Sequence, residues 1–153
     1  TGGGTRQEHS LEVQLPFLQT MLGDFKLVPI VMGEQEWDNI SALSEALAAG
    51  LKGTDSLIVA STDLSHFYSS EIAAQKDSII RSKVEAFDPQ GLYKAIAKGN
   101  AEACGGGPMA SAMLACRKLG AERIAVTGQS DSGKVTGDSH EVVGYLGAVI
   151  YSD

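Results

Sequence analysis

The feature that most constrains the fold is a short apolar run at residues 56–60 (SLIVA), which passes directly into the polar segment STDLSH at residues 61–66. A continuous apolar stretch of this length is typical of a strand that is covered on both faces. Polar residues that follow such a strand lie at the edge of the sheet, where α/β proteins usually build their sites. The sequence therefore predicts a buried strand at residues 56–60 and a functional loop after it.

Helical spacing of apolar residues, together with start and stop signals, predicts five helices. Their expected ranges are 5–22, 37–51, 70–87, 88–99 and 108–120. Thr5 and Glu8 fit a capping box, and Ser70 fits an N-cap. Strand-like patterns occur at residues 25–32, 56–60, 123–127 and 141–151. Pro29 cannot donate a backbone hydrogen bond, which favours a sheet edge for the first of these strands.

The alternation of helices and strands predicts an α/β fold, a layered α/β/α domain with a small mixed central sheet. With 153 residues and 43% hydrophobic content, the chain has the size of one domain, expected to span residues 1–153. Four strands make a narrow sheet, so a missing N-terminal portion or a partner chain, as in a homo-oligomer, should complete it. The opening TGGGT, without an initiator Met, also indicates a start within a domain, although an engineered or processed chain fits equally.

The charge of the chain bears on its partners. The formal net charge is −7, and no stretch gathers Lys and Arg into a block. Nucleic acid and anionic membranes are therefore not expected as partners. No apolar run approaches the roughly 20 residues that span a bilayer, and no signal-peptide pattern is seen, so a cytoplasmic location is expected. Cys104 and Cys116 lie within or beside one predicted helix, and both are interpreted as thiols.

His9 and His66 are the first candidates for chemistry. His9 is expected on the first helix, opposite its main apolar stripe, and a lone histidine in that setting is more often a core or surface residue than a ligand. His66 closes the loop after the buried strand. Asp63 stands three residues earlier, close enough to accept an imidazole N–H and to fix its tautomer. The alternative, an Asx-type turn with a structural histidine, is equally compatible with this segment.

Cys104 is the third candidate, because it precedes GGGP at the start of a predicted helix. A thiol before a helix N-terminus is placed where the dipole stabilises thiolate, the form that binds metal or attacks carbon. Cys116 is interpreted as a small core residue and His140 as structural or peripheral. The triple glycine lacks the Lys of a P-loop, and no CxxC, HExxH or GxSxG motif occurs.

Four segments, EHSLEVQLPFL, STDLSH, CGGGP and GDSHEVVGYLGAVIY, together resemble the Memo family in order and separation. The resemblance covers nearly the whole chain. The family is similar in fold to the LigB-type class III extradiol dioxygenases, and its bacterial and archaeal members are known as AmmeMemoRadiSam system protein B.

The resemblance implies a metal site with His9 and Cys104 as two of three ligands. The third family ligand, a histidine from an early loop, has no counterpart in this chain. The resemblance also implies that His66 is the acid/base and Asp63 its partner. A set of two histidines and one cysteine departs from the two-His, one-carboxylate triad, and its thiolate favours a softer metal such as copper. Iron(II) stays open as the second choice.

The leading hypothesis is therefore a metal-dependent oxidoreductase that resembles extradiol dioxygenases and acts on a small-molecule substrate. A non-catalytic module that uses the same pocket to bind a peptide or a protein, such as a radical-SAM partner, is the alternative. A nucleophilic hydrolase built on Cys104 and His66 is a third reading. Because one ligand lies outside this chain, we expect the chain alone to hold metal weakly.

Overall fold

The computed structural model describes residues 9–152, and the chain divides into two compact units, Thr1–Val31 and Met32–Asp153. In the first, the 3₁₀ turn η1 (Glu12–Gln14) leads into the helix α1 (Leu15–Leu22). The expectation that residues 1–153 form a single domain stays a prediction.

The predicted helix at residues 5–22 is wrong at residues 9–14, where the structure has a turn and the short segment η1, and its capping box lies outside the described residues. His9 precedes the helix instead of lying on it, because the regular α-helix begins only at Leu15. Pro16 explains this start, because proline has no backbone N–H. In a helix that continued from residue 9, the hydrogen bond donated by residue 16 would be missing, and the proline ring would clash with the carbonyl four residues earlier. The first helical turn tolerates a proline, and Pro16 stands there.

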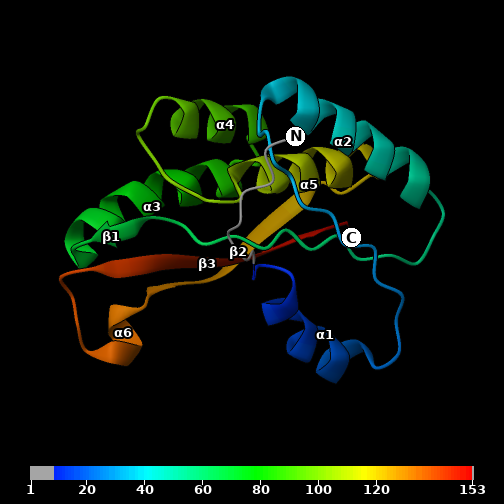
Figure 1. Ribbon diagram of the computed structural model, residues 1–153. Helices are drawn as coiled ribbons and strands as arrows, with labels where there is room; N and C mark the ends of the chain where they lie inside the picture. The colour runs from blue at the N-terminus through cyan, green and yellow to red at the C-terminus, as the bar shows by residue number, and fades with distance from the viewer. Residues whose placement is uncertain (1–8, 153) are drawn as a thin grey trace. The chain divides into compact units, whose positions relative to one another are not determined.

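The second unit contains a sheet and most of the helices (Figure 1). Its elements are α2 (Trp37–Leu51), β1 (His66–Tyr68), α3 (Ser70–Glu85), α4 (Pro89–Ala97), α5 (Gly106–Lys118), β2 (Arg123–Asp131), α6 (Gly133–Thr136) and β3 (Val142–Tyr151). The sheet has the order β1-β3-β2, and both pairings are antiparallel. The predicted α/β class is confirmed, with a sheet of three strands.

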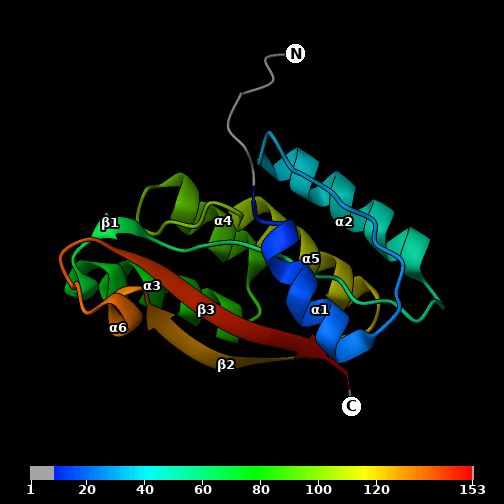
Figure 2. The same ribbon diagram turned by 60° about the horizontal axis from the view of Figure 1, so that its bottom comes forward.

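The helices of this unit lie in two layers against the sheet (Figures 1 and 2). Helix α3 packs directly on β2 and β3, while α2 and α4 pack on α5. Alternate residues of β3 follow this arrangement: Leu146 and Ile150 pack against the core, whereas Tyr145 and Val149 are exposed. Strand β3 is therefore amphipathic.

Local capping explains where the helices of this unit begin. The side chain of Ser69 accepts a bond from the Ile72 N–H, so the cap of α3 is one residue earlier than the predicted Ser70. Asp88 caps α4 by accepting from the Gly91 N–H at 2.8 Å. Helix α5 begins at Gly106, two residues before the predicted start. No helix in residues 9–152 combines the length and apolar character of a bilayer span.

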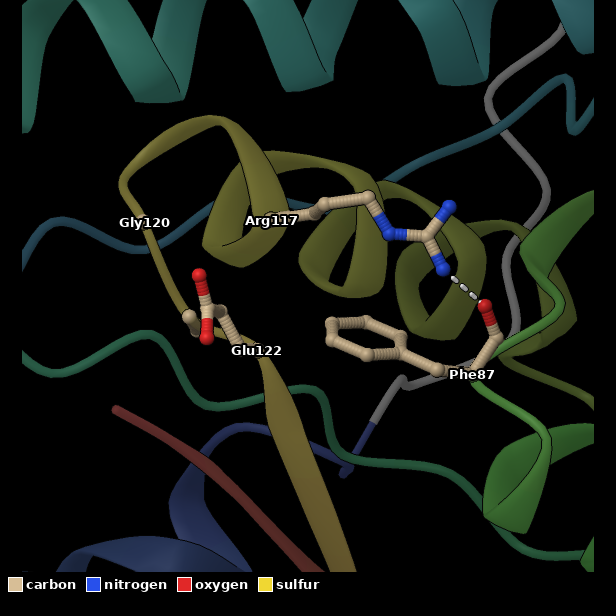
Figure 3. A pocket seen from close by; sticks show the side chains of 5 residues that line it. Phe87, Arg117, Gly120 and Glu122 are labelled. Atoms are coloured by element: carbon tan, nitrogen blue, oxygen red, sulfur yellow. Dashed lines mark hydrogen bonds between the residues drawn. The ribbon is translucent and has the colours of Figure 1, made fainter. Parts of the chain in front are cut away.

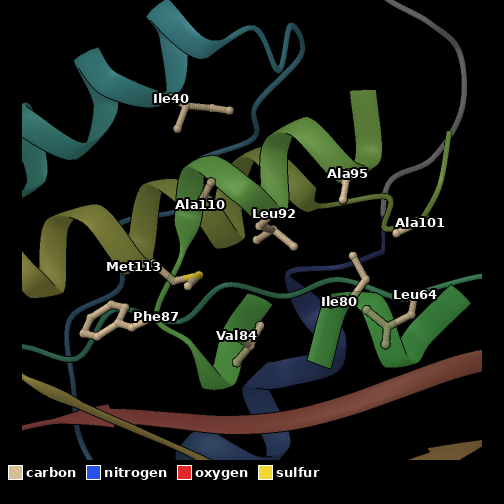
Figure 4. Packing of buried hydrophobic residues seen from close by; sticks show 10 residues of the cluster. All are labelled: Ile40, Leu64, Ile80, Val84, Phe87, Leu92, Ala95, Ala101, Ala110 and Met113. Atoms are coloured by element: carbon tan, nitrogen blue, oxygen red, sulfur yellow. The ribbon is translucent and has the colours of Figure 1, made fainter. Parts of the chain in front are cut away.

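The apolar core lies where α2, α3, α4 and α5 meet above the sheet (Figure 4). Its buried members are Ile40, Leu64, Ile80, Val84, Phe87, Leu92, Ala95, Ala101, Ala110 and Met113. Side chains of β2 and β3 pack against this cluster from below. Burial of these side chains supplies the main driving force for folding of this unit.

The predicted strands at residues 25–32 and 56–60 are wrong. A strand needs a neighbour for its backbone N–H and C=O groups, and neither segment pairs with another strand among the described residues. Leu57 is 65% exposed and Val59 is 46% exposed, so the segment expected to be covered on both faces is largely open. Strand β1 forms instead at His66, the last residue of the expected polar loop.

Asp77 is a buried carboxyl on α3, with 2% of its surface exposed. The Ser65 N–H donates to its Oδ1 at 3.1 Å, and a Cβ at Gly144 of β3 would overlap the carboxylate. Burial raises the pKa of Asp77 above its usual range, and the bond from the Ser65 N–H opposes part of that rise. The buried Oγ of Ser65 has no hydrogen-bond partner among the described residues.

We predict that Asp77→Asn raises the free energy of unfolding at pH 7 by about 1 kcal/mol, the net worth of one good hydrogen bond. The asparagine oxygen still accepts from Ser65, and its NH₂ gains the Ser65 Oγ as a partner without a buried charge. Because the folded pKa of Asp77 is raised from 3.8, the stability of the unmodified protein falls as the pH rises through the window between the two values.

Urea denaturation between pH 4 and pH 7 measures this effect. The advantage of the asparagine variant should shrink toward the acidic end, where the pH approaches 3.8 and the folded carboxyl becomes protonated. Asp55→Asn, at an exposed carboxyl, is the matched control. A variant less stable than the unmodified chain at pH 7 would show that the charge of Asp77 stabilises the fold.

Candidate functional site

Cys104 lies immediately before Gly105, the N-cap of α5, as the sequence predicts. Its side chain is exposed. The Asp63 N–H donates to its Sγ at 3.2 Å, and the Oγ1 of Thr62 lies 3.4 Å from the same sulfur. The exposed sulfur therefore lies against the backbone of the 61–65 loop, directly before the first turn of α5.

The backbone around Cys104 is held from two sides. From the 61–65 loop, the Asp63 carbonyl accepts from the Cys104 N–H at 3.2 Å, and the Thr62 Oγ1 accepts from the Gly105 N–H at 2.6 Å. From the segment before α2, the Gln35 Nε2 donates to the Cys104 carbonyl at 2.8 Å. Its Oε1 accepts from the Gly107 N–H at 2.7 Å. These bonds fix the turn that carries the thiol.

Sequence reasoning missed Thr62 and Gln35. Thr62 stands inside the STDLSH segment, and its position beside Asp63 is a signal that could have identified it. Gln35 lies 69 residues from its partner Cys104, and nothing in its local pattern indicates that contact.

His66 and Asp63 are brought together beside this turn. The His66 Nε2 lies 3.8 Å from the Asp63 Oδ2, and the two side chains are 31% and 50% exposed. This distance is longer than a hydrogen bond, so the contact is an ion pair when the imidazole is protonated. Asp63 thus faces both candidates, with its main chain on Cys104 and its carboxylate toward His66.

A β-bulge sets the orientation of His66 in β1. His66 pairs with Val143 and Tyr68 with Val142, and the register shifts between them. Phe67, at the shift, has a φ of 63° and is 75% exposed. A bulky residue with positive φ is a genuine outlier, and such strain often accompanies functional sites.

A polar network adjoins His66 on the far side of the bulge. The Tyr68 hydroxyl donates to the Glu102 Oε1 at 2.6 Å, and the Lys76 Nζ donates to it at 3.0 Å. The Tyr68 bond, followed by the Lys76 bond and a smaller effect of His66, lowers the pKa of Glu102 against the opposing effect of burial. The same bonds to Glu102 raise the pKa of Tyr68 and of Lys76. Glu102 is therefore a carboxylate two residues before Cys104.

The other candidates lie apart from this group. His9 belongs to the first unit, where its Nδ1 lies 2.5 Å from the Glu12 Oε1, and the structure assigns it no position relative to Cys104. His140 is 93% exposed and bonded to Asp138, which agrees with a peripheral residue. Cys116 is half-buried in α5, and burial raises the pKa of its thiol.

The donor chemistry fits one ligand position of a transition-metal site. Cys104 offers an exposed sulfur that accepts from the Asp63 N–H and lies 3.4 Å from the Thr62 Oγ1. Within the part of the chain that the structure describes, no group of three His, Cys, Asp or Glu side chains lies close enough to hold a metal ion.

A separate pocket lies at the opposite end of α5 (Figure 3). There the Arg117 guanidinium stacks 4.4 Å from the centre of the Phe87 ring and donates to the Phe87 carbonyl. At 1.5 Å per residue, α5 separates this pocket from Cys104 by roughly 20 Å. The pocket contains none of the predicted site residues and is no part of the same site.

Comparison with known proteins decides the family. A family model described as Memo-like protein matches residues 3–149. The chain belongs to the Memo family. A MEMO1 family protein of Methanosarcina acetivorans is 38% identical over 150 residues, which cover 96% of this chain and 56% of the relative. One from Thermoplasma volcanium is 40% identical over 143 residues, or 93% of this chain and 52% of the relative. The chain therefore spans about half the length of the curated Memo-family relatives it matches.

We predict that Gly105→Ala destabilises this Memo-family chain by about 2 kcal/mol, the usual cost of forcing an extra methyl into a packed site. A Cβ at this position would lie 2.7 Å from the Thr62 Cβ and 2.9 Å from the Ser61 carbonyl oxygen. The loop that holds Cys104 must then move. Thermal denaturation followed by circular dichroism measures the change.

Gly50→Ala is the matched control, because this glycine lies in α2 and a Cβ there would meet nothing within 4 Å. It should be neutral or stabilise the chain slightly, since alanine favours a helix more than glycine does. Equal melting temperatures for the two variants would contradict the close approach of the two loops.

Proposed function

We propose that this Memo-family chain contributes Cys104 and His9 to a non-haem metal centre of an oxidoreductase that acts on a small molecule. His66 serves as the acid/base, and Asp63 orients it. The centre is completed by a further ligand from outside this chain. The architecture expected for it resembles that of the extradiol dioxygenases.

The observation that carries the proposal is the meeting of Cys104, Asp63 and His66 at the start of α5. Asp63 contacts both others, through its N–H to the Cys104 Sγ at 3.2 Å and through its Oδ2 to the His66 Nε2 at 3.8 Å. A sulfur ligand and a proton-transfer group are thereby joined through one residue. This combination suits a reaction in which a bound substrate loses or gains a proton.

The chain's own residues have defined tasks in this proposal. The His66 imidazole takes a proton from the substrate, and the Asp63 carboxylate, which faces its Nε2, offsets the resulting positive charge. Glu102, kept ionised by Tyr68 and Lys76, adds negative potential near the imidazole. The bonds from Gln35 and Thr62 hold the Cys104 turn in place.

A bound metal would supply open positions for substrate or oxygen and would polarise what binds there. Cys104 would hold it through thiolate, and His9 through imidazole nitrogen. The thiolate favours copper, and iron(II) is the second choice.

We predict that Cys104→Ala and His9→Ala each weaken copper binding by about 100-fold. Loss of a residue that only hydrogen-bonds a ligand already weakens metal binding by up to about 100-fold, and loss of the ligand itself should cost at least as much. Each variant removes a donor atom that no neighbour replaces. Equilibrium dialysis against a series of free copper concentrations, at equal protein concentrations, measures the effect and also detects weak binding.

Two matched variants control for general damage. Cys116→Ala removes the half-buried thiol of α5, and His140→Ala removes the exposed imidazole before β3. Both should retain as much copper as the unmodified chain. Retention by Cys104→Ala at the unmodified level would rule out the proposed centre.

A binding module is the second candidate, and Phe67 is the observation that favours it. This aromatic side chain is 75% exposed, and its ring centre lies 5.8 Å from that of His66. Exposed aromatic residues beside polar groups are common anchors of protein contacts. The same copper experiment separates the two functions, because a binding module would not depend on the metal.

A further inference from the structure

We propose that Thr62 is a positioning residue for the Cys104 sulfur, and that its hydroxyl donates to the thiolate once a metal has displaced the thiol proton. This inference rests on the proposed metal centre and adds a residue that neither the motif nor the family resemblance assigns. It follows from how the hydrogen atoms around Thr62 can be distributed.

The Thr62 hydroxyl has one hydrogen to donate and two lone pairs to accept with. One lone pair is occupied by the Gly105 N–H at 2.6 Å, which ties the side chain to the first turn of α5. The hydrogen has two acceptors within reach, the Asp63 carbonyl at 2.8 Å and the Cys104 Sγ at 3.4 Å. The hydroxyl can therefore turn from one acceptor to the other without moving its oxygen.

Coordination of a metal by the Cys104 sulfur decides between these acceptors. A neutral thiol carries its own hydrogen, which lies within reach of the Asp63 carbonyl at an Sγ–O distance of 3.6 Å. A thiol that coordinates a metal is deprotonated, and its sulfur becomes a charged acceptor. Charge-assisted hydrogen bonds are about twice as strong as neutral ones, so the Thr62 hydroxyl then donates to the sulfur and not to the carbonyl.

Two donors would then hold the thiolate, the Asp63 N–H at 3.2 Å and the Thr62 hydroxyl. The Asp63 carbonyl keeps the Cys104 N–H as its donor at 3.2 Å, so it is not left without a partner. Because the Gly105 bond fixes the oxygen of Thr62, the sulfur is held in a set direction relative to α5.

Cobalt(II) titration of the chain tests this inference, with the thiolate-to-cobalt charge-transfer band as the readout. Hydrogen bonds to a thiolate lower the energy of its lone pairs, so their loss shifts the band to longer wavelength. We predict this shift, together with about tenfold weaker cobalt binding, for Thr62→Val and Thr62→Ala. Thr62→Ser keeps the hydroxyl and should restore both the band position and the affinity.

Thr54→Val is the matched control, since the Thr54 hydroxyl bonds the Leu51 carbonyl and Ser56 and not Cys104. Either Thr62→Val or Thr62→Ala is sufficient for the test, provided that its circular dichroism spectrum matches that of the unmodified chain. A band that stays in place without the hydroxyl, or a serine variant that behaves like valine, overturns the role of Thr62 and leaves the metal centre intact. Absence of the band from the unmodified chain overturns the metal centre and this inference together.

Discussion

The hydrogen bonds between the 61–65 loop and the first turn of α5 are the constraint on which the candidate site depends. Cys104 and Asp63 are joined through backbone and sulfur, and Gly105 and Thr62 through amide and hydroxyl. Two segments about 40 residues apart in sequence are thereby fixed within hydrogen-bond distance. Gly105 is required at the crossing, because any side chain there would collide with Thr62. The chemistry proposed for Cys104 and His66 follows from this contact.

The second constraint is the amphipathic sheet. One face of β3 packs on the helical layers, while Tyr145 and Val149 on the other face remain exposed, as does the apolar segment 56–60. Isolated apolar side chains on a surface are ordinary, but a strand-like run without a neighbouring strand is not. The chain spans only about half the length of its Memo-family relatives, and this apolar surface belongs to that half. The candidate site and this sheet lie in the same unit.

Sequence reasoning predicted the features that depend on local patterns. Helix α2, the restart of α4 at Asp88 and the placement of Cys104 before a helix all follow from spacing and capping, and the structure confirms them. It failed where partners decide the outcome. The apolar run at 56–60 has strand composition without a pairing strand, and Pro16 delays the helix that was expected to carry His9. The roles of Gln35 and Thr62 depend on contacts across the fold, which composition and periodicity do not encode.

The proposed function requires that the Cys104 thiolate and an imidazole share one metal ion. X-ray absorption at the cobalt edge tests it most directly, with the cobalt-loaded chain compared with its Cys104→Ala variant. We predict one sulfur scatterer and at least one imidazole in the first coordination shell, with the sulfur lost from the variant. A shell of oxygen and nitrogen alone in the unmodified chain would contradict it.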